Sequence, residues 1–316
     1  IANAKVLGMI GPWTSNVAFA EIPVANPYDL AMISPTNTND CITREEPAVC
    51  LSGQPPWRSL THPNNYFRIA SPDSFQGRAL AQYITSVGVT RAAAFNEFGA
   101  RGELLVKDFG EALAAAGGKL VFSQDLDPAT RSFTSFLHSA NAAGAQAILA
   151  VGQANYRICA ARAQMTDILP KGALFLGYDG IVDGGCIKDA ADNAGGMIVA
   201  SSDVGPTQSS DAAMVQAAAN FRKAFPKIKD IQPYVFAAYD CARILIDAIQ
   251  RAVDANGGGK PTRADVVKAL SQAHFEGATG TYSFDAHGDA LSPMMSIYKV
   301  DNGQWVLQNK IDISTN

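Results

Sequence analysis

The chain has 316 residues, of which 47% are hydrophobic and 17% charged, and its net charge at pH 7 is −4. This composition supplies a substantial apolar core and is too apolar for a disordered chain. A nucleic-acid-binding protein is disfavoured, because phosphates are met by clustered Lys and Arg and the sequence has no long basic run. No apolar stretch reaches the ~20 residues that a membrane-spanning helix needs. One large or two medium domains are expected.

Apolar runs and helical periodicity alternate along the chain. Strands are predicted at residues 4–11, 30–34, 91–97, 119–126, 145–153, 173–180 and 195–203. Helices are predicted at residues 17–26, 76–87, 102–116, 132–143, 155–166, 211–224, 234–256 and 263–273, the last with Thr262 as N-cap. Residues 35–66 are polar and lack periodicity, which indicates a surface elaboration. The chain then ends in a strand and tight turn at 281–289 and a hairpin at 295–308, whose turn is Asp301-Asn302-Gly303.

Strands that are apolar throughout are typical of parallel sheets covered by helices on both faces. Two such strand-helix series, separated by the polar segment, predict two α/β lobes. In sheets of this kind, ligands bind beyond the carboxyl ends of the strands. The polar residues that follow the strands are therefore the candidate binding residues.

The five cysteines are Cys41, Cys50, Cys159, Cys186 and Cys241. The spacing of Cys41 and Cys50 suits a small disulfide-closed loop in an exported protein, and two unrelated thiols are the alternative. Cys159 and Cys186 form a weaker second candidate pair, and Cys241 is expected to be a buried free thiol. No pair has CxxC spacing, which disfavours zinc and thioredoxin-type chemistry. No cofactor and no metal site are predicted.

Two hydroxyl-rich segments follow predicted strands near the N-terminus. GPWTSN (11–16) precedes a helix, where unpaired N–H groups and the hydroxyl of Ser15 suit an anion; plain N-capping by Thr14 or Ser15 is the alternative. SPTNT (34–38) brings Thr36 and Thr38 to a neighbouring strand end, unless that turn only satisfies its own backbone. Convergence of the two segments on one spot favours binding.

Further candidates lie elsewhere in the sequence. Asp179 in GYDG (177–180) follows a strand of the second series and suits a ligand ammonium, although Asp is also common in turns. Trp13 and Tyr234 are candidate apolar walls of the site, and each is equally compatible with a place in the core.

The segments that carry these residues are GPWTSNVAFAEIPVAN, ISPTNT, FRIASPDSFQG, GYDG, YVFAAYDCARILIDAI and GATGTYSFDAHGD. In this order they resemble the periplasmic solute-binding proteins of branched-chain amino-acid ABC transporters, the type I binding proteins of the leucine/isoleucine/valine-binding protein family. The GPxxS, SPxxT and TGxxSFDxxGD patterns carry most of the resemblance, which runs over nearly the whole chain. It implies an α/β fold of two doubly wound parallel-sheet lobes joined by a hinge. Lobe 1 would hold residues 1–72 and 203–295, and lobe 2 residues 73–202 and 296–316.

The resemblance also implies roles for individual residues. Ser15, Thr36 and Thr38 would hold the carboxylate of the ligand through hydroxyl and backbone groups. Asp179 would pair with its ammonium, and Tyr234 would line the cleft.

The sequence departs from the family pattern in two respects. Asp179 stands where members often have a Glu, and Arg101 and Gln153 stand where a Tyr is frequent. Both departures favour a polar ligand over a simple aliphatic amino acid, with a second acidic group that Arg101 would meet. A solvated residue at a helix start is the alternative for Arg101.

Members of the family begin with two strand-helix units ahead of the GPxxS strand, roughly sixty residues in all. This chain begins at Ile1, without those units and without a signal peptide. The first lobe is therefore expected to be N-terminally incomplete: the sequence is a fragment of a longer protein, or another chain fills the gap, or the lobe is rebuilt.

The sequence thus predicts a non-catalytic, monomeric, extracytoplasmic protein, periplasmic or lipid-anchored at the cell surface. It would close two lobes on a small carboxylate ligand, an amino acid in first place, and deliver it to a membrane ABC-transporter permease. A ligand-sensing receptor domain of the same fold and a binder of an aromatic or other organic acid without an amino group are the alternatives. An enzyme is disfavoured, because the sequence has no GxSxG, P-loop or HExxH motif and its four His are not close to a strand-end nucleophile.

Overall fold

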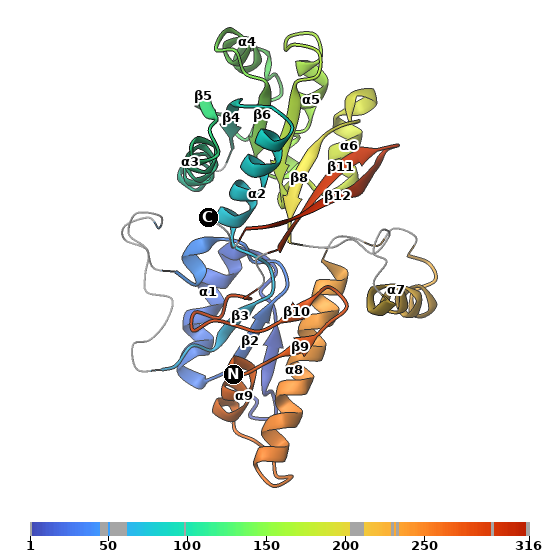
Figure 1. Cartoon of the computed structure of the whole chain (residues 1–316). Helices are drawn as coiled ribbons and strands as arrows, with labels where there is room; N and C mark the ends of the chain where they lie inside the picture. The colour runs from blue at the N-terminus through green and yellow to red at the C-terminus, as the bar shows by residue number, and fades with distance from the viewer. Residues whose placement is uncertain are drawn as a thin grey trace. The chain divides into compact units, whose positions relative to one another are not determined.

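The computed structural model describes residues 2–44, 50, 62–97, 99–202, 212–228, 231, 234–291 and 294–313. The chain divides into two compact units. Unit 1 comprises Ile1–Pro72 and Asp203–Ser292, and unit 2 comprises Asp73–Ser202 and Pro293–Asn316. Each unit has a sheet and a core of its own (Figure 1).

Unit 2 is built on a seven-stranded sheet of order β12-β11-β8-β7-β6-β4-β5. Its strands are β4 (Arg91–Asn96), β5 (Lys119–Asp125), β6 (Ala147–Val151), β7 (Leu174–Tyr178), β8 (Ile198–Ser201), β11 (Met294–Asp301) and β12 (Gln304–Asp312). The strands from β4 to β8 run parallel, as their unbroken apolar runs predict, and β11 pairs antiparallel with β8 and β12. The turn of that last hairpin has positive φ at Asn302 and Gly303, which confirms the predicted turn.

Helices cover both faces of this sheet. Ala92 and Ala94 of β4 face a core with α2 (Asp73–Ser86) and α3 (Ala100–Ala115). Ala93 and Phe95, which alternate with them, face a second core with α4 (Thr134–Ala142), α5 (Ala160–Met165) and α6 (Gly184–Asp189). The predicted disulfide between Cys159 and Cys186 is confirmed, with the Cα atoms 5.2 Å apart. The helix α6 was not predicted, because six residues carry little periodicity.

Unit 1 contains a parallel three-stranded sheet of order β1-β2-β3, with β1 (Gly8–Ile10), β2 (Ala31–Ser34) and β3 (Tyr66–Arg68). One face packs on α1 (Ser15–Ala25), and the other on α8 (Val235–Ala255) and α9 (Arg263–Ser271). Thr262 forms a capping box with Asp265, which confirms it as the N-cap of α9. The predicted strand 4–11 shrinks to three residues, because β2 runs beside it only there. The strand β3 was missed, since three buried residues in polar surroundings give no pattern.

The remaining elements of unit 1 are short or peripheral. They are α7 (Ala212–Ala224), which packs on Phe236 of α8, and the strand pair β9 (Phe275–Glu276) and β10 (Thr281–Tyr282). Short 3-10 turns occur at Asn26–Tyr28, Asp40–Ile42, Ala154–Tyr156, Asp179–Ile181 and Ala191–Asn193.

The polar segment 35–66 lies in unit 1. Its predicted disulfide between Cys41 and Cys50 is confirmed, and residues 45–49 and 51–61 lie outside the described part of the chain. Cys241 is a buried free thiol, also as predicted.

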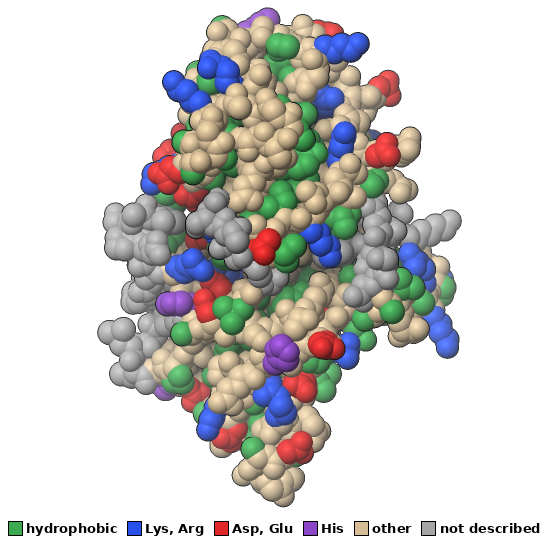
Figure 2. Space-filling view, viewed as in Figure 1, with side chains coloured by type: hydrophobic (Ala, Val, Ile, Leu, Met, Phe, Trp, Pro, Cys, Tyr) green, Lys and Arg blue, Asp and Glu red, His purple; other side chains and the backbone are tan. Residues whose placement is uncertain are grey.

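Two features of the described surface and helices bear on charge and membrane insertion. On the face shown in Figure 2, Lys and Arg side chains lie scattered among Asp and Glu. Of the helices that the structure describes, none is both long enough and apolar enough to cross a bilayer.

Candidate ligand-binding site

In unit 1 the two hydroxyl-rich turns are joined by the side chain of Ser34, the last residue of β2. Its hydroxyl donates to the carbonyl of Pro12 at 2.8 Å. The same oxygen accepts the N–H groups of Thr36 at 3.2 Å and Asn37 at 3.1 Å. Ser34 is fully buried, so this hydroxyl is structural and holds the GPWTSN and SPTNT turns side by side.

Ser15 and Thr38 lie on these two turns and carry hydrogen-bond donors that no described residue accepts. Ser15 is the first residue of α1, and its hydroxyl oxygen accepts the N–H of Asn39 at 3.4 Å. The N-cap residue Thr14 makes no side-chain capping bond. Among the described residues, no acceptor receives the hydroxyl of Ser15 or the N–H groups of Ser15 and Asn16, and neither donor of Thr38 has a partner. Ser15 and Thr38 are 7% and 6% exposed, so these donors stand in a shielded place that suits an anion.

The hydroxyl of Thr36 links the two turns. It donates to the carbonyl of Trp13 in a short contact that ties the second turn to the first. This bond helps to fix the backbone of both turns.

The aromatic pair of unit 1 stands beside these turns. Trp13 is 59% exposed, which excludes a place in the core, and its ring centroid lies 6.3 Å from that of Tyr234 at an interplanar angle of 89°. Tyr234 precedes α8 with φ of +67°, a left-handed conformation that a residue with a large side chain seldom adopts. Tyr234 is half-buried against the core of α8 and α9, so the edge-to-face pair exposes mainly the ring of Trp13 as an apolar surface for a small ligand.

In unit 2 the carboxylate of Asp179 follows β7 and is held by Gln76 of α2. The N–H of Asp179 donates to Gln76 Oε1 at 2.8 Å, and Gln76 Nε2 donates to Asp179 Oδ1 at 3.1 Å. Gln76 Nε2 also donates to Asp73 Oδ1 at 3.2 Å. Sequence reasoning missed Gln76 and Asp73, because nothing in the helical pattern of α2 distinguishes a buried Gln from a solvated one.

Gln153 follows β6, the strand next to β7, and its side chain is exposed. A Cβ at Gly180 would lie 2.8 Å from the carbonyl of Gly152 and 3.4 Å from Gln153 Cγ. The glycine at position 180 therefore lets the ends of the two strands approach, and brings Gln153 and Asp179 to one edge of the sheet. Arg101 lies in α3, and its side chain is outside the described part of the structure.

Glu97 is a second residue that sequence reasoning missed. It directly follows β4, is 3% exposed, and has no hydrogen-bond partner for either carboxylate oxygen among the described residues. Burial raises the pKa of Glu97 to about 8; Arg131 opposes the rise and Asp127 adds to it. Glu97 is therefore a neutral acid at neutral pH, at the same sheet edge as Gln153 and Asp179. The available signal was a Glu immediately after an apolar strand.

Comparison with known proteins identifies the family. A family model described as "Periplasmic binding protein" matches residues 1–304. Comparison with curated proteins gave no match. Proteins of this family bind solutes without transforming them, which confirms the prediction of a non-enzyme.

Solved structures support the same fold. The leucine-binding protein LivK of Thermotoga maritima superposes with a TM-score of 0.78 at 21% identity, over 98% of this chain and 80% of that one. An ABC transporter substrate-binding protein from Desulfitobacterium hafniense in complex with Leu gives 0.76 at 19% identity, over 97% and 82% of the two chains. A solute-binding protein of an ABC transporter from R. palustris in complex with benzoate gives 0.74 at 20% identity, over 97% and 78%. By fold and by the extent of the family match, the chain belongs to the periplasmic binding protein family.

Proposed function

We propose that this protein is an extracytoplasmic solute-binding protein that captures a small carboxylate ligand for uptake by an ABC transporter. An amino acid is the first candidate for this ligand. The observation that supports it most is the set of unpartnered donors on Ser15 and Thr38 in a protein of this family. Two strand-end turns, locked together by Ser34, present hydroxyl and N–H groups that no described residue accepts.

A carboxylate is the ligand group that this donor set fits. It offers two oxygens with about four acceptor sites, and hydrogen bonds to an ionised acceptor are about twice as strong as neutral ones. A neutral amide in the same place would bring an NH₂ group against donors, which leaves donors facing donors. We therefore infer that Ser15 and Thr38 hold the carboxylate, while Thr36 supports them through its bond to Trp13.

The remaining candidate residues would contact the other parts of the ligand. Asp179 is proposed as the partner of an ammonium, and the double hydrogen bond from Gln76 favours this by orienting the carboxylate. Gln153 and Arg101 are proposed to meet further polar or acidic groups. Trp13 and Tyr234 would cover an apolar part of the ligand.

An aromatic acid without an amino group is the second candidate ligand. The exposed ring of Trp13, edge-to-face with Tyr234, favours it, and one structural relative binds benzoate. The leucine complex of another relative favours the amino acid. A ligand-sensing receptor domain would use the same binding groups, and only an attached signalling partner in place of a transporter would distinguish it.

The cellular setting follows from the cysteines and the family. Two disulfides are stable in an oxidising compartment and rare in the cytosol. We propose a periplasmic or surface-anchored protein that acts as a monomer and delivers its ligand to a membrane permease.

The test is a thermal-shift screen with acids and their matched amides: L-leucine with L-leucinamide, and benzoate with benzamide. A ligand that binds only the folded state stabilises it by mass action and so raises the melting temperature. At a hundredfold excess over Kd the free energy of unfolding rises by about 2.7 kcal/mol. We expect a shift with an acid and a much smaller one with its amide. A shift with L-leucine supports the ammonium role of Asp179, and a shift with benzoate alone supports the second ligand class. Equal shifts with acids and amides would refute the carboxylate site.

A further inference from the structure

The turn that carries Thr38 is held from behind by a buried arginine on a different strand. Arg68, the last residue of β3, is fully buried. Its Nη1 donates to the carbonyl of Asn37 at 3.1 Å and to that of Asn39 at 2.8 Å. These two carbonyls flank Thr38, so one guanidinium nitrogen grips the backbone on both sides of the proposed binding residue.

The geometry of the peptide bond means that these two contacts also fix the direction of the Thr38 N–H. In a trans peptide the C=O and the following N–H point in opposite directions. The carbonyl of Asn37 points at Arg68, so the N–H of Thr38, in the same peptide unit, points away from it. By the same reasoning the N–H of Asp40 points away as well. Arg68 thus fixes the direction in which Thr38 presents its backbone donor.

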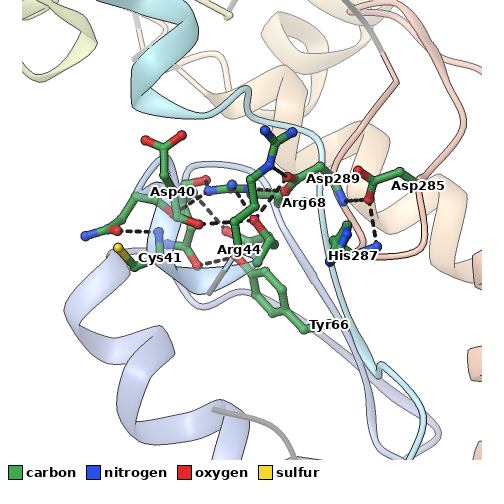
Figure 3. A network of polar contacts seen from close by, with 12 residues as sticks. Asp40, Cys41, Arg44, Tyr66, Arg68, Asp285, His287 and Asp289 are labelled. Atoms are coloured by element: carbon green, nitrogen blue, oxygen red, sulfur yellow. Dashed lines mark hydrogen bonds and ion pairs between the residues drawn. The ribbon is translucent and has the colours of Figure 1, made fainter. Parts of the chain in front are cut away.

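Asp289 holds the guanidinium in place. Arg68 Nε donates to Asp289 Oδ1 at 2.6 Å, and Arg68 Nη2 donates to the hydroxyl of Thr43 at 2.7 Å. That hydroxyl in turn donates to Asp289 Oδ2 at 3.0 Å, and Arg44 Nε reaches the same oxygen at 3.3 Å. In Figure 3 the side chains of Arg44 and Arg68 converge on Asp289. Burial alone raises the pKa of Asp289, but Arg68 and Thr43 more than offset that rise, so its pKa lies below the usual range.

The FDxxGD pattern at residues 284–289 forms the turn that carries Asp289. Asp285 Oδ1 accepts the N–H groups of His287 at 2.8 Å and Asp289 at 2.9 Å, which shapes the turn. Gly288 has φ of +88°, and a Cβ there would lie 2.1 Å from the carbonyl of Tyr66. Only glycine lets the turn press against β3, where the N–H of Arg68 donates to the Gly288 carbonyl at 2.9 Å.

A second bond fixes the same turn from the same strand. The hydroxyl of Tyr66 donates to Asn37 Oδ1 at 2.8 Å. Backbone and side chain of Asn37 are both held by β3, so the residue before Thr38 has little freedom. Among the described residues Asn37 Nδ2 is buried without a partner, but the bonds to the carbonyl and to Oδ1 hold the turn in one arrangement before any ligand arrives.

We propose that Arg68, held by Asp289, is a positioning residue that aims the donors of Thr38 at the ligand carboxylate and thereby sets the preference for an acid over its amide. This rests on the proposed function, since it assigns a cause to the selectivity of that same site. Asp289 of the FDxxGD pattern thus acts on the ligand indirectly, through Arg68, which lies 221 positions earlier in the sequence.

The test is calorimetric titration of the whole chain with the acid–amide pairs L-leucine with L-leucinamide and benzoate with benzamide. The readout is the ratio of amide Kd to acid Kd, which a merely structural role would not change. In Arg68→Lys, which keeps the charge but cannot grip two carbonyls and Asp289 at once, we expect the ratio to fall about tenfold, the loss of one charge-assisted hydrogen bond. In Thr43→Val, which keeps both charges and removes the hydroxyl between them, we expect about a threefold fall.

Asp240→Asn is the matched control. Asp240 is another fully buried carboxylate of unit 1, and it accepts the N–H groups of Ala278 at 2.9 Å and Thr279 at 2.7 Å, neither of which belongs to the Thr38 turn. We expect this variant to lower the melting temperature and leave the ratio unchanged.

The outcomes separate the two claims. If the wild type shows no preference for acids, the proposed function fails. If the wild type prefers acids and the ratio stays unchanged in Arg68→Lys and Thr43→Val, the positioning role is overturned while the proposed function stands. Should Arg68→Lys fail to fold, Thr43→Val decides alone.

Discussion

Gln76 holds Asp179 with both ends of its amide: its oxygen accepts the backbone N–H at 2.8 Å, and its nitrogen donates to the carboxylate at 3.1 Å. The two residues are 103 positions apart in sequence, and Gln76 is 1% exposed. A buried amide that satisfies backbone and side chain together leaves Asp179 little freedom of orientation. The proposed role of Asp179 as an ammonium partner would make use of this fixed orientation.

The role of Asp179 predicts a selective loss in Asp179→Asn. The substitution removes the charge that would pair with an ammonium, so binding of L-leucine should weaken by about 1.5–3 kcal/mol, and binding of benzoate should change little. Calorimetric titration of both probes measures the difference. An equal loss for the two ligands would show that Asp179 acts on the fold and not on an ammonium.

The carboxylate site predicts that Ser15→Ala and Thr38→Val each weaken the binding of an acid ligand by about 1–3 kcal/mol. Each variant removes one hydroxyl donor. The melting temperature without ligand should move little, because neither hydroxyl donates to a described residue and the bond that Ser15 accepts from Asn39 is long, at 3.4 Å. Ser271→Ala is the control, since Ser271 is exposed at the end of α9 and its hydroxyl donates to the carbonyl of Lys268. Wild-type affinity in both test variants would remove the carboxylate from these turns.

Glu97 predicts how the stability of unit 2 depends on pH. Its pKa is raised to about 8 in the folded protein, above the value of about 4.3 in an unfolded chain. The stability tied to the protonated group is therefore complete below pH ~4 and is lost as pH rises through 8. Glu97→Gln is neutral at every pH, so it should escape this loss and exceed the wild type by about 1–3 kcal/mol at pH 9, the desolvation cost of an unsatisfied buried group.

Urea unfolding at pH 5 and pH 9 measures this effect. Glu111→Gln serves as the control, because Glu111 lies on the exposed face of α3 and, within the part of the chain that the structure describes, pairs only with Lys107, at 3.5 Å. If the Glu97→Gln and wild-type stabilities change in parallel between the two pH values, Glu97 is not the titrating group.

The cysteines predict a simple thiol count. Cys241 is fully buried and the other four form two disulfides, so a thiol reagent should find no reactive group in the native, oxidised protein and one after denaturation. Removing the Cys159–Cys186 bond, which spans 27 positions, should lower the free energy of unfolding by about 3–4 kcal/mol on the chain-entropy estimate. A native count above zero would contradict the pairing.

The sequence by itself determined most of the long elements and the resemblance to a family. Apolar runs such as residues 145–153 and periodic stretches such as 234–256 depend on near neighbours, so they can be read without a fold. Local chemistry likewise predicted the cap at Thr262, the hairpin turn at Asn302-Gly303 and the loop closed by Cys41 and Cys50. The strand-end turns with Ser15 and Thr38 were visible for the same reason.

Only the tertiary structure decided which polar residues act together. Arg68 meets Asp289 and Gln76 meets Asp179 because the chain folds back on itself, and no spacing rule relates positions 221 or 103 residues apart. The burial of Glu97 and the exposure of Trp13 were equally hidden, since each depends on which distant elements cover the side chain. Periodicity is a property of neighbours along the chain, whereas the partners of a buried charge are set by the three-dimensional packing of segments that the sequence keeps apart.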